Sequence, residues 1–272
     1  MELLTFAREV LQKEKIEYVS ALPLSECSIV RPYLLERAGI DENGSVIMLA
    51  VPYLVRDEEE SNISLYAVPR DYHLYFAQLF ERVIPILKDK FPQNKFVGFS
   101  DHSPINELNA AAKSGLGVIG KNHMLITSKY ASFVFLGEIV TDIPYSEKIA
   151  GIEYCTDCGR CERACPVGLD SGRCLSALTQ KKGSFNDLEA ETLKKHASVW
   201  GCDICQNACP YSFSAKESEI EFFREKRLPF ITEGTIRNMS DEDFSERAYS
   251  WRGRDVILRN LQLVRDRDNE QV

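Results

Sequence analysis

The stretch CTDCGRCERACP at residues 155–166 decides how this chain folds around it. A second stretch, CDICQNACP at residues 202–210, has the same Cys-Pro ending. Together with Cys174, the two stretches contain eight of the nine cysteines, which is the number of ligands that two 4Fe-4S clusters require. The sequence therefore predicts a redox protein with two clusters.

The spacing of these cysteines has a physical basis. A cubane cluster needs four thiolates around one small inorganic core, and a turn with cysteines three residues apart supplies three of them. In two-cluster ferredoxins the cysteine before the proline binds the other cluster, because the turn has already carried it past the first one. This crossover predicts the ligands Cys155, Cys158, Cys161 and Cys209 for one cluster, and Cys165, Cys174, Cys202 and Cys205 for the other.

Two other uses of these cysteines fit the pattern less well. Structural zinc favours two separated Cys-x-x-Cys pairs around a tetrahedral ion, whereas this chain has a triple run and two Cys-Pro endings. Disulfides are disfavoured because no secretory signal opens the chain, and such runs in an intracellular protein are typical of metal sites. The ninth cysteine, Cys27, lies far from both stretches and is interpreted as a small buried apolar side chain.

The composition predicts a soluble, cytoplasmic globular protein. The 272 residues are 44% hydrophobic and 27% charged, with a net charge of -8 and a pI of about 5.2. No apolar run is long enough to cross a bilayer. This acidic balance argues against general affinity for nucleic acid, so a nucleic-acid partner requires a local basic patch. The candidates, which are more often ordinary solvated faces, are Lys181, Lys182, Lys194, Lys195, Arg247, Arg252, Arg254 and Arg259.

Hydrophobic periodicity predicts a mixed α/β part before the cysteine stretches. Helical spacing runs over residues 3–15 and 72–91, and Pro85 predicts a kink or a break in the second helix. Short apolar runs predict buried strands at residues 45–52, 96–99 and 134–140.

Asp101 follows the second of these strands and precedes an Ala-rich helix that starts near Ile105. In open α/β sheets ligands collect at the carboxyl ends of strands, where a reactive side chain is useful. Taken by itself, the local sequence favours a helix N-cap, a role that Asp commonly fills. The glycines within residues 115–120 end a helix instead of opening one, so they predict a turn or a helix C-cap and not a dinucleotide site.

Several motifs, taken in order, closely resemble epoxyqueuosine reductase. The resemblance extends from about residue 45 to about residue 265, and the ordered combination is far more specific than any single motif. The chain ends at Val272 without the further C-terminal helical repeats of common members, so the resemblance is to a short form. The matching motifs are Tyr66-Ala67, Asp71-Tyr-His73, Asp101-His-Ser-Pro104, Gly115-Leu-Gly117, Ile119-Gly-Lys-Asn122, Phe135-Leu-Gly-Glu-Ile139, Thr141-Asp142, Arg173-Cys-Leu-Ser176 and Gly201-Cys-Asp-Ile-Cys-Gln206.

The resemblance implies a cobalamin-dependent oxidoreductase with two 4Fe-4S clusters, related to reductive dehalogenases. Enzymes of this family perform the last step of queuosine biosynthesis, in which an epoxide on the modified base of a tRNA is reduced to an alkene. Electrons are expected to pass through the clusters to cobalamin from an external donor such as a flavodoxin or a ferredoxin. The resemblance further implies a cytoplasmic monomer with no membrane partner.

Individual residues can be carried over where they match the motifs. Asp101 matches the proton donor of the family and a cobalamin contact, which overturns the N-cap interpretation. A free Asp carboxyl has a pKa of about 3.9, so burial beside an apolar corrin face must raise the pKa of an acid that works at neutral pH. The other positions expected to approach cobalamin are Lys121, Asn122, Leu125, Ser176, Cys202 and Asp203.

The implied fold class is α+β. An α/β cobalamin-binding domain like that of reductive dehalogenases is expected over residues 1–146, and a ferredoxin-like double-cluster domain over residues 147–215. A C-terminal helical segment, residues 216–272, is expected to pack on this core.

Two other functions stay open at this point. A corrinoid reductase of the same architecture that acts on a small molecule, such as an organohalide, would bind cobalamin without affinity for tRNA. A non-catalytic electron carrier would bind clusters and no corrinoid.

Overall fold

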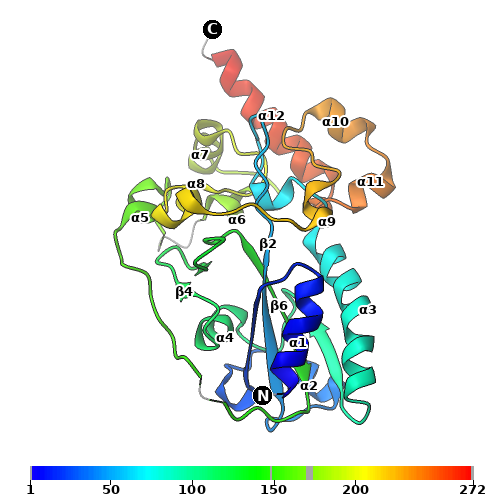
Figure 1. The fold of residues 1–272 in the computed structure, drawn as a ribbon. Helices are drawn as coiled ribbons and strands as arrows, with labels where there is room; N and C mark the ends of the chain where they lie inside the picture. The colour runs from blue at the N-terminus through cyan, green and yellow to red at the C-terminus, as the bar shows by residue number, and fades with distance from the viewer. Residues whose placement is uncertain (1, 148, 170–173, 271–272) are drawn as a thin grey trace. The chain divides into compact units, whose positions relative to one another are not determined.

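The protein, seen here as a computed structural model, is described for residues 2–147, 149–169 and 174–270 (Figure 1). Its internal contacts divide the chain into two compact units. This division differs from the predicted one, because residues 54–71 and most of residues 216–272 group with the cysteine-bearing segment. The first unit consists of Met1–Tyr53, Tyr72–Asp157 and Ser214–Ile220, and the second of Leu54–Asp71, Cys158–Phe213 and Glu221–Val272.

A four-stranded sheet in the order β1-β2-β6-β3 forms the centre of the first unit. The three strands predicted from apolar runs are confirmed as β2, β3 and β6. Every neighbouring pair is antiparallel, so the rule that places ligands at the carboxyl ends of parallel strands does not account for the position of Asp101. The strands are β1 (Tyr18–Pro23), β2 (Ser45–Pro52), β3 (Phe96–Phe99) and β6 (Val134–Thr141).

Helices cover both faces of this sheet, which is why all eight residues of β2 are buried. Helices α1 (Glu2–Lys13) and α3 (Tyr72–Lys90) pack together beside β1 and β3, and α4 (Glu107–Lys113) packs on β2 and β6. Figure 1 shows α3 and α4 on opposite sides of the sheet. The approach of α3 is close, because a Cβ added at Gly137 would lie 2.3 Å from the ring of Phe76.

Helix α3 continues through Pro85, so the predicted break is wrong. Pro85 lies on the exposed side of the helix, where water can satisfy the carbonyl group that loses its intrahelical partner. The apolar stripe of α3, which includes Phe76, Leu79 and Val83, stays buried on both sides of the proline. Burial of this stripe therefore outweighs the local cost of the proline.

A Schellman turn ends α4 and directs the chain into a short hairpin. Gly115 has a φ of +85°, its N–H donates to the carbonyl of Ala112, and the N–H of Leu116 donates to the carbonyl of Ala111. The predicted C-cap role of this glycine is thereby confirmed. The remaining elements of the first unit are η1 (Leu24–Glu26), α2 (Pro32–Ala38) and the hairpin strands β4 (Val118–Ile119) and β5 (Leu125–Ile126).

The second unit is built from short helices around a buried Trp200. The indole Nε1 of Trp200 donates to the hydroxyl of Tyr66 at 2.8 Å, and the ring meets that of Tyr249 edge-on. In the part of the chain that is described, no helix is both long enough and apolar enough to span a bilayer. The helices are η2 (Leu65–Ala67), α5 (Arg160–Ala164), α6 (Leu175–Thr179), α7 (Asp187–His196), α8 (Ile204–Asn207), η3 (Pro210–Ser214), α9 (Glu221–Arg224), α10 (Glu233–Asn238), α11 (Asp241–Ser245), η4 (Ser250–Arg252) and α12 (Arg254–Glu270).

Candidate redox and acid-base site

Both cysteine stretches lead into a short helix of the second unit. The first stretch continues into α5 and the second into α8, and the two helices pack against each other. Gly159 allows the first turn because its φ of +69° lies in the left-handed region. None of the nine cysteines, all of which lie within the described residues, forms a disulfide. This arrangement is the one expected for two ferredoxin-like runs, although no three His, Cys, Asp or Glu side chains among the described residues converge tightly enough to hold a single metal ion.

Several of these thiols influence one another electrostatically. Burial is the main cause that raises the pKa of Cys205 to about 12, and Cys202, Cys165, Cys174 and Cys161 contribute to the same rise. Burial is likewise the main cause that raises the pKa of Cys202 to about 11. Four of these five cysteines are predicted to bind the second cluster, and Cys161 is predicted to bind the first. Because neighbouring thiols disfavour ionisation of Cys202 and Cys205, bound metal would favour their thiolate form by supplying positive charge.

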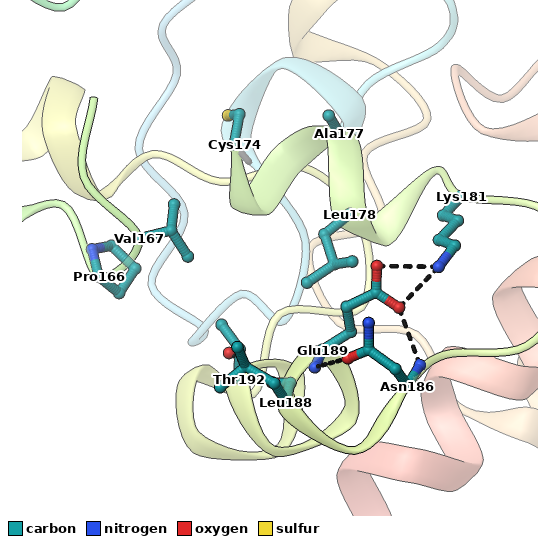
Figure 2. Close-up of a pocket in the computed structure, with 10 residues that line it drawn as sticks. All are labelled: Pro166, Val167, Cys174, Ala177, Leu178, Lys181, Asn186, Leu188, Glu189 and Thr192. Carbon is teal, nitrogen blue, oxygen red and sulfur yellow. Dashed lines mark hydrogen bonds and ion pairs between the residues drawn. The ribbon is translucent and has the colours of Figure 1, made fainter. Parts of the chain in front are cut away.

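Cys174 also lines a pocket of about 530 Å³ in the second unit (Figure 2). Leu178 on α6 and Leu188 on α7 contribute apolar lining. The ion pair between Lys181 Nζ and Glu189, at 2.6 Å, closes one side. One predicted cluster ligand therefore faces an open space instead of packed side chains.

Cys155 belongs to the first unit and is already held there by backbone groups. Its N–H donates to the carbonyl of Ile119, and its Sγ accepts the N–H of Lys121 at 3.4 Å. The Lys121 side chain forms an ion pair with Asp157 at 3.0 Å. The backbone N–H of Lys121 is therefore in contact with a predicted cluster ligand. Hydrogen bonds from N–H groups to ligand sulfur atoms tune the reduction potential of a cluster. Its expected contact with cobalamin stays a prediction.

Asp101 lies on a left-handed turn two residues after β3, with a φ of +62°. Its N-cap interpretation is wrong, because Asn106 caps α4 by accepting the N–H of Asn109. The backbone N–H of Asp101 instead donates to Glu107 Oε1 at 3.2 Å. Its carboxylate Oδ2 lies 3.6 Å from Nε2 of His73, and the side chain is 69% exposed. The burial expected of a proton donor must therefore come from a bound group.

An aromatic stack orients His73. The ring of Tyr72 lies between those of His73 and Phe135, with centroids 4.1 Å and 4.3 Å away, and Phe135 continues the stack to Tyr53. This stack ties the start of α3 to the first strand residues of β6. The imidazole therefore meets Asp101 in a fixed orientation.

Two carboxyl groups near the turn of Asp101 were not predicted from the sequence. Glu138 on β6 is completely buried, and burial raises its pKa well above the usual range. Burial also raises the pKa of Glu107, and the two side chains lie within hydrogen-bonding reach of each other. A Glu inside the apolar run 134–140 was the signal that could have identified the pair.

The other two predicted cobalamin positions of the first unit differ from each other. The side-chain amide of Asn122 is buried, and neither Oδ1 nor Nδ2 has a hydrogen-bond partner among the described residues. A buried amide in this state needs a polar ligand, so Asn122 fits a bound cofactor. Leu125 is buried in the apolar core beside α4, and its expected contact with cobalamin stays a prediction.

Two of the cobalamin positions predicted in the second unit, Ser176 and Asp203, form hydrogen bonds with other residues of the protein. The Asp203 carboxylate accepts the hydroxyl of Ser64 and, at 2.7 Å, the N–H of Leu65. Asp203 therefore stabilises the turn before η2. Burial raises the pKa of its carboxyl group. Ser176 on α6 is half-buried, and its hydroxyl accepts Gln180 Nε2 at 3.3 Å.

The arginines proposed as a basic patch have structural roles. Arg254 donates to the carbonyls of Ile236 and Met239 and so closes the end of α10. Arg259 donates to the carbonyl of Gly183 and lies over the ring of Phe185 at 3.9 Å. These two guanidinium groups are therefore not merely solvated charges.

Comparisons with known proteins agree with this description. A family model described as "4Fe-4S double cluster binding domain" matches residues 154–212, and one described as "Epoxyqueuosine reductase QueG, DUF1730" matches residues 37–102. The chain is 34% identical over 217 residues to the epoxyqueuosine reductase of Gloeobacter violaceus, covering 74% of this chain and 68% of that protein. It is 32% identical over 209 residues to the enzyme of Listeria monocytogenes, covering 71% of this chain and 54% of that protein. The chain thus spans between about half and two thirds of the length of these relatives.

Solved structures show the same fold. The epoxyqueuosine reductase of Streptococcus thermophilus aligns with a TM-score of 0.80 at 21% identity, over 98% of this chain and 82% of that chain. An epoxyqueuosine reductase solved with an epoxyqueuosine-modified tRNA-Tyr stem loop aligns with a TM-score of 0.73 at 21% identity, over 96% and 81%. A structure from Bacillus subtilis, whose catalytic loop is swung out of the active site, aligns with a TM-score of 0.72 at 22% identity, over 96% and 81%.

Proposed function

The chain belongs to the epoxyqueuosine reductase family, and from this premise we propose that it reduces the epoxide of epoxyqueuosine in tRNA to the alkene of queuosine. The observation that carries the proposal is the placement of Asp101. It extends an exposed carboxyl from a turn held by Glu107, next to the imidazole of His73. In the same chain, residues 154–212 form a double-cluster domain.

The reaction consumes two electrons and two protons, converts the epoxide to an alkene and releases its oxygen as water. Asp101 is proposed to donate the proton that the developing alkoxide needs, because an acid must lie within hydrogen-bond reach of that oxygen. His73 is placed to return a proton to Asp101, since its Nε2 lies 3.6 Å from the carboxylate. The exposure of both side chains leaves them accessible to a docked base.

The electrons require cofactors. The cysteines are assigned to two 4Fe-4S clusters as predicted, with Cys155, Cys158, Cys161 and Cys209 on one and Cys165, Cys174, Cys202 and Cys205 on the other.

Cobalamin, when bound, would supply a low-valent and strongly reducing cobalt. Support for a cobalamin site in this chain comes from the buried amide of Asn122, whose polar atoms lack hydrogen-bond partners among the described residues. Lys121, Leu125, Ser176, Cys202 and Asp203 complete the proposed contacts.

The substrate is proposed to be a tRNA whose modified base is splayed out of its loop, because enzymes that act on a base must take it out of the stack. The relative solved with a modified tRNA stem loop supports this choice over a small molecule. An external donor such as a flavodoxin or a ferredoxin would supply the electrons. We further propose a cytoplasmic location and a monomeric state.

The Bacillus subtilis relative supports a mobile acid in this chain as well. Its catalytic loop can leave the active site, and we infer the same of the turn that carries Asp101. A mobile loop of this kind needs contacts that hold Asp101 in its catalytic position.

The test is anaerobic purification with iron, sulfide and cobalamin, followed by an assay of reductant-dependent conversion of epoxyqueuosine to queuosine in tRNA. We expect conversion by the native chain and by the control Asp89→Asn, which changes an exposed carboxyl of α3. We expect conversion by Asp101→Asn to be slower by a factor of about 100 or more. Bound clusters and cobalamin without conversion by the native chain would contradict the proposed substrate.

A further inference from the structure

The turn that carries Asp101 is held by a carboxyl pair inside the first unit. Glu138 extends from β6 into the core toward α4, where Glu107 is the first helical residue. Ser103, only 1% exposed, lies beside them. Neither oxygen of Glu138 has a hydrogen-bond partner of good geometry among the described residues, and the nearby Ser103 hydroxyl lowers the Glu138 pKa less than burial and Glu107 raise it. If both carboxyl groups were ionised, two negative charges would therefore lie together in a buried site with little compensation.

A shared proton resolves this conflict. Two carboxyl groups in contact cannot both ionise at low cost, and a single proton between them lets one donate a hydrogen bond to the other. Burial raises the pKa of both Glu107 and Glu138, which agrees with a proton retained at neutral pH. Among the described residues, the guanidinium of Arg31 has the smallest of the named influences on the Glu107 pKa, so it does not replace this proton.

The pair reaches Asp101 through one hydrogen bond. Glu107 Oε1 accepts the backbone N–H of Asp101 at 3.2 Å. The left-handed φ of Asp101 is unfavourable for a residue with a side chain, so the surrounding structure has to hold it. Glu107 stabilises this backbone conformation by accepting the N–H of Asp101, and Glu138 orients the side chain of Glu107.

We propose that Glu107 and Glu138 are positioning residues, a proton-sharing pair that fixes the turn of Asp101 and releases it when the shared proton is lost at alkaline pH. This inference rests on the proposed role of Asp101 as the acid. Ionisation of both carboxyl groups drives them apart, and Glu107 then moves away from the N–H that it holds.

Other titratable groups face the pair or its neighbour and have to be considered. The Cys27 thiol lies near Glu138, but burial raises its pKa to about 12, so it stays protonated over the range tested. Arg31 and Asp101 both influence Glu107, and His73 lies 3.6 Å from the Asp101 carboxylate.

The test measures hydrogen exchange at the Asp101 amide in the cluster-loaded full chain, expressed as a protection factor so that the intrinsic pH dependence of exchange is removed. Between about pH 7 and about pH 9 we expect the native protection factor to fall by about tenfold. In Glu138→Gln the amide group donates permanently to Glu107, so we expect a change of less than about twofold. The exposed control Glu36→Gln should behave as the native chain does.

Two results would overturn the proposal. One is a native protection factor that does not change with pH, and the other is an equal fall in Glu138→Gln. A second variant, Glu107→Ala, removes the acceptor and should lower protection at every pH, with cluster absorbance reporting that the chain is folded. Because exchange needs no substrate, loss of queuosine formation with the expected exchange pattern would reject the proposed function and not the pair.

Discussion

The acid site of the first unit and the thiols of the second are preorganised in different ways. Asp101 is held by protein groups alone, through Glu107 and His73. Among the thiols of the second unit, burial raises the pKa of Cys202 and of Cys205, and neighbouring thiols add to both rises. The acid is therefore positioned by protein groups, whereas the thiols need bound metal to favour their charged form.

Removing a thiol should have the largest effect. Cys205→Ala deletes a ligand of the proposed second cluster, so we expect about four fewer iron atoms per chain and no turnover. Cys27→Ala is the matched control, because Cys27 lies in the first unit and its thiol donates to the carbonyl of Pro23. Iron and sulfide analysis after reconstitution measures the difference. Equal iron content in the two variants would show that Cys205 binds no cluster.

Removing the acid should affect chemistry and leave the metal sites unchanged. Asp101→Asn keeps the backbone N–H that bonds Glu107, so the turn is retained and only the proton is lost. We expect turnover to fall by a factor of about 100 to 10,000, the usual contribution of a general acid. Single-turnover kinetics and the iron content of the same preparation measure both effects. Near-normal turnover would exclude Asp101 as the proton donor.

The carboxyl pair makes stability depend on pH. The pKa values of Glu107 and Glu138 are raised from 4.5 in the folded protein, so the folded state retains protons that the unfolded state releases. Stability should therefore fall as pH rises above 4.5, by up to about 1.4 kcal/mol per pH unit for each proton retained.

Urea unfolding at several pH values measures this slope, and Glu138→Gln should flatten it. Glu36→Gln, an exposed change in α2, is the control and should leave the slope as it is. A slope that is the same in all three proteins would mean that the pair holds no extra proton.

The smallest expected effect concerns Asp203 of the second unit. This residue is next to Cys202 in the chain, and its carboxylate is held by protein groups. Ser64→Ala removes the hydroxyl that donates to the buried Asp203 carboxylate. We expect a loss of about 1 to 3 kcal/mol in the free energy of unfolding, since the carboxylate keeps only its bond from Leu65. Ser184→Ala, at an exposed position of the same unit, should cost much less. Comparable losses would mean that Asp203 is not held by Ser64.

Several elements of the fold could be predicted from local sequence patterns. The three strands were predicted correctly because their apolar runs are short and continuous, and Gly115 was recognised because a left-handed C-cap favours glycine. The break at Pro85 was wrong because tertiary burial of the helix stripe outweighed a local preference. The N-cap at Asp101 was wrong because Asn106 was closer to the start of the helix and took that role.

The sequence by itself determined the redox chemistry of this protein, because the spacing of cysteines within a short turn sets which thiolates can meet one cluster. It also placed Asp101 among the motifs of a family. Only the tertiary structure decided what holds that acid. Glu138 and Glu107 come from a strand and a helix that are 31 positions apart in the chain, counted from 138 to 107, and no local pattern relates them. Burial in a folded core turns two ordinary carboxyl groups into a pair that must share a proton.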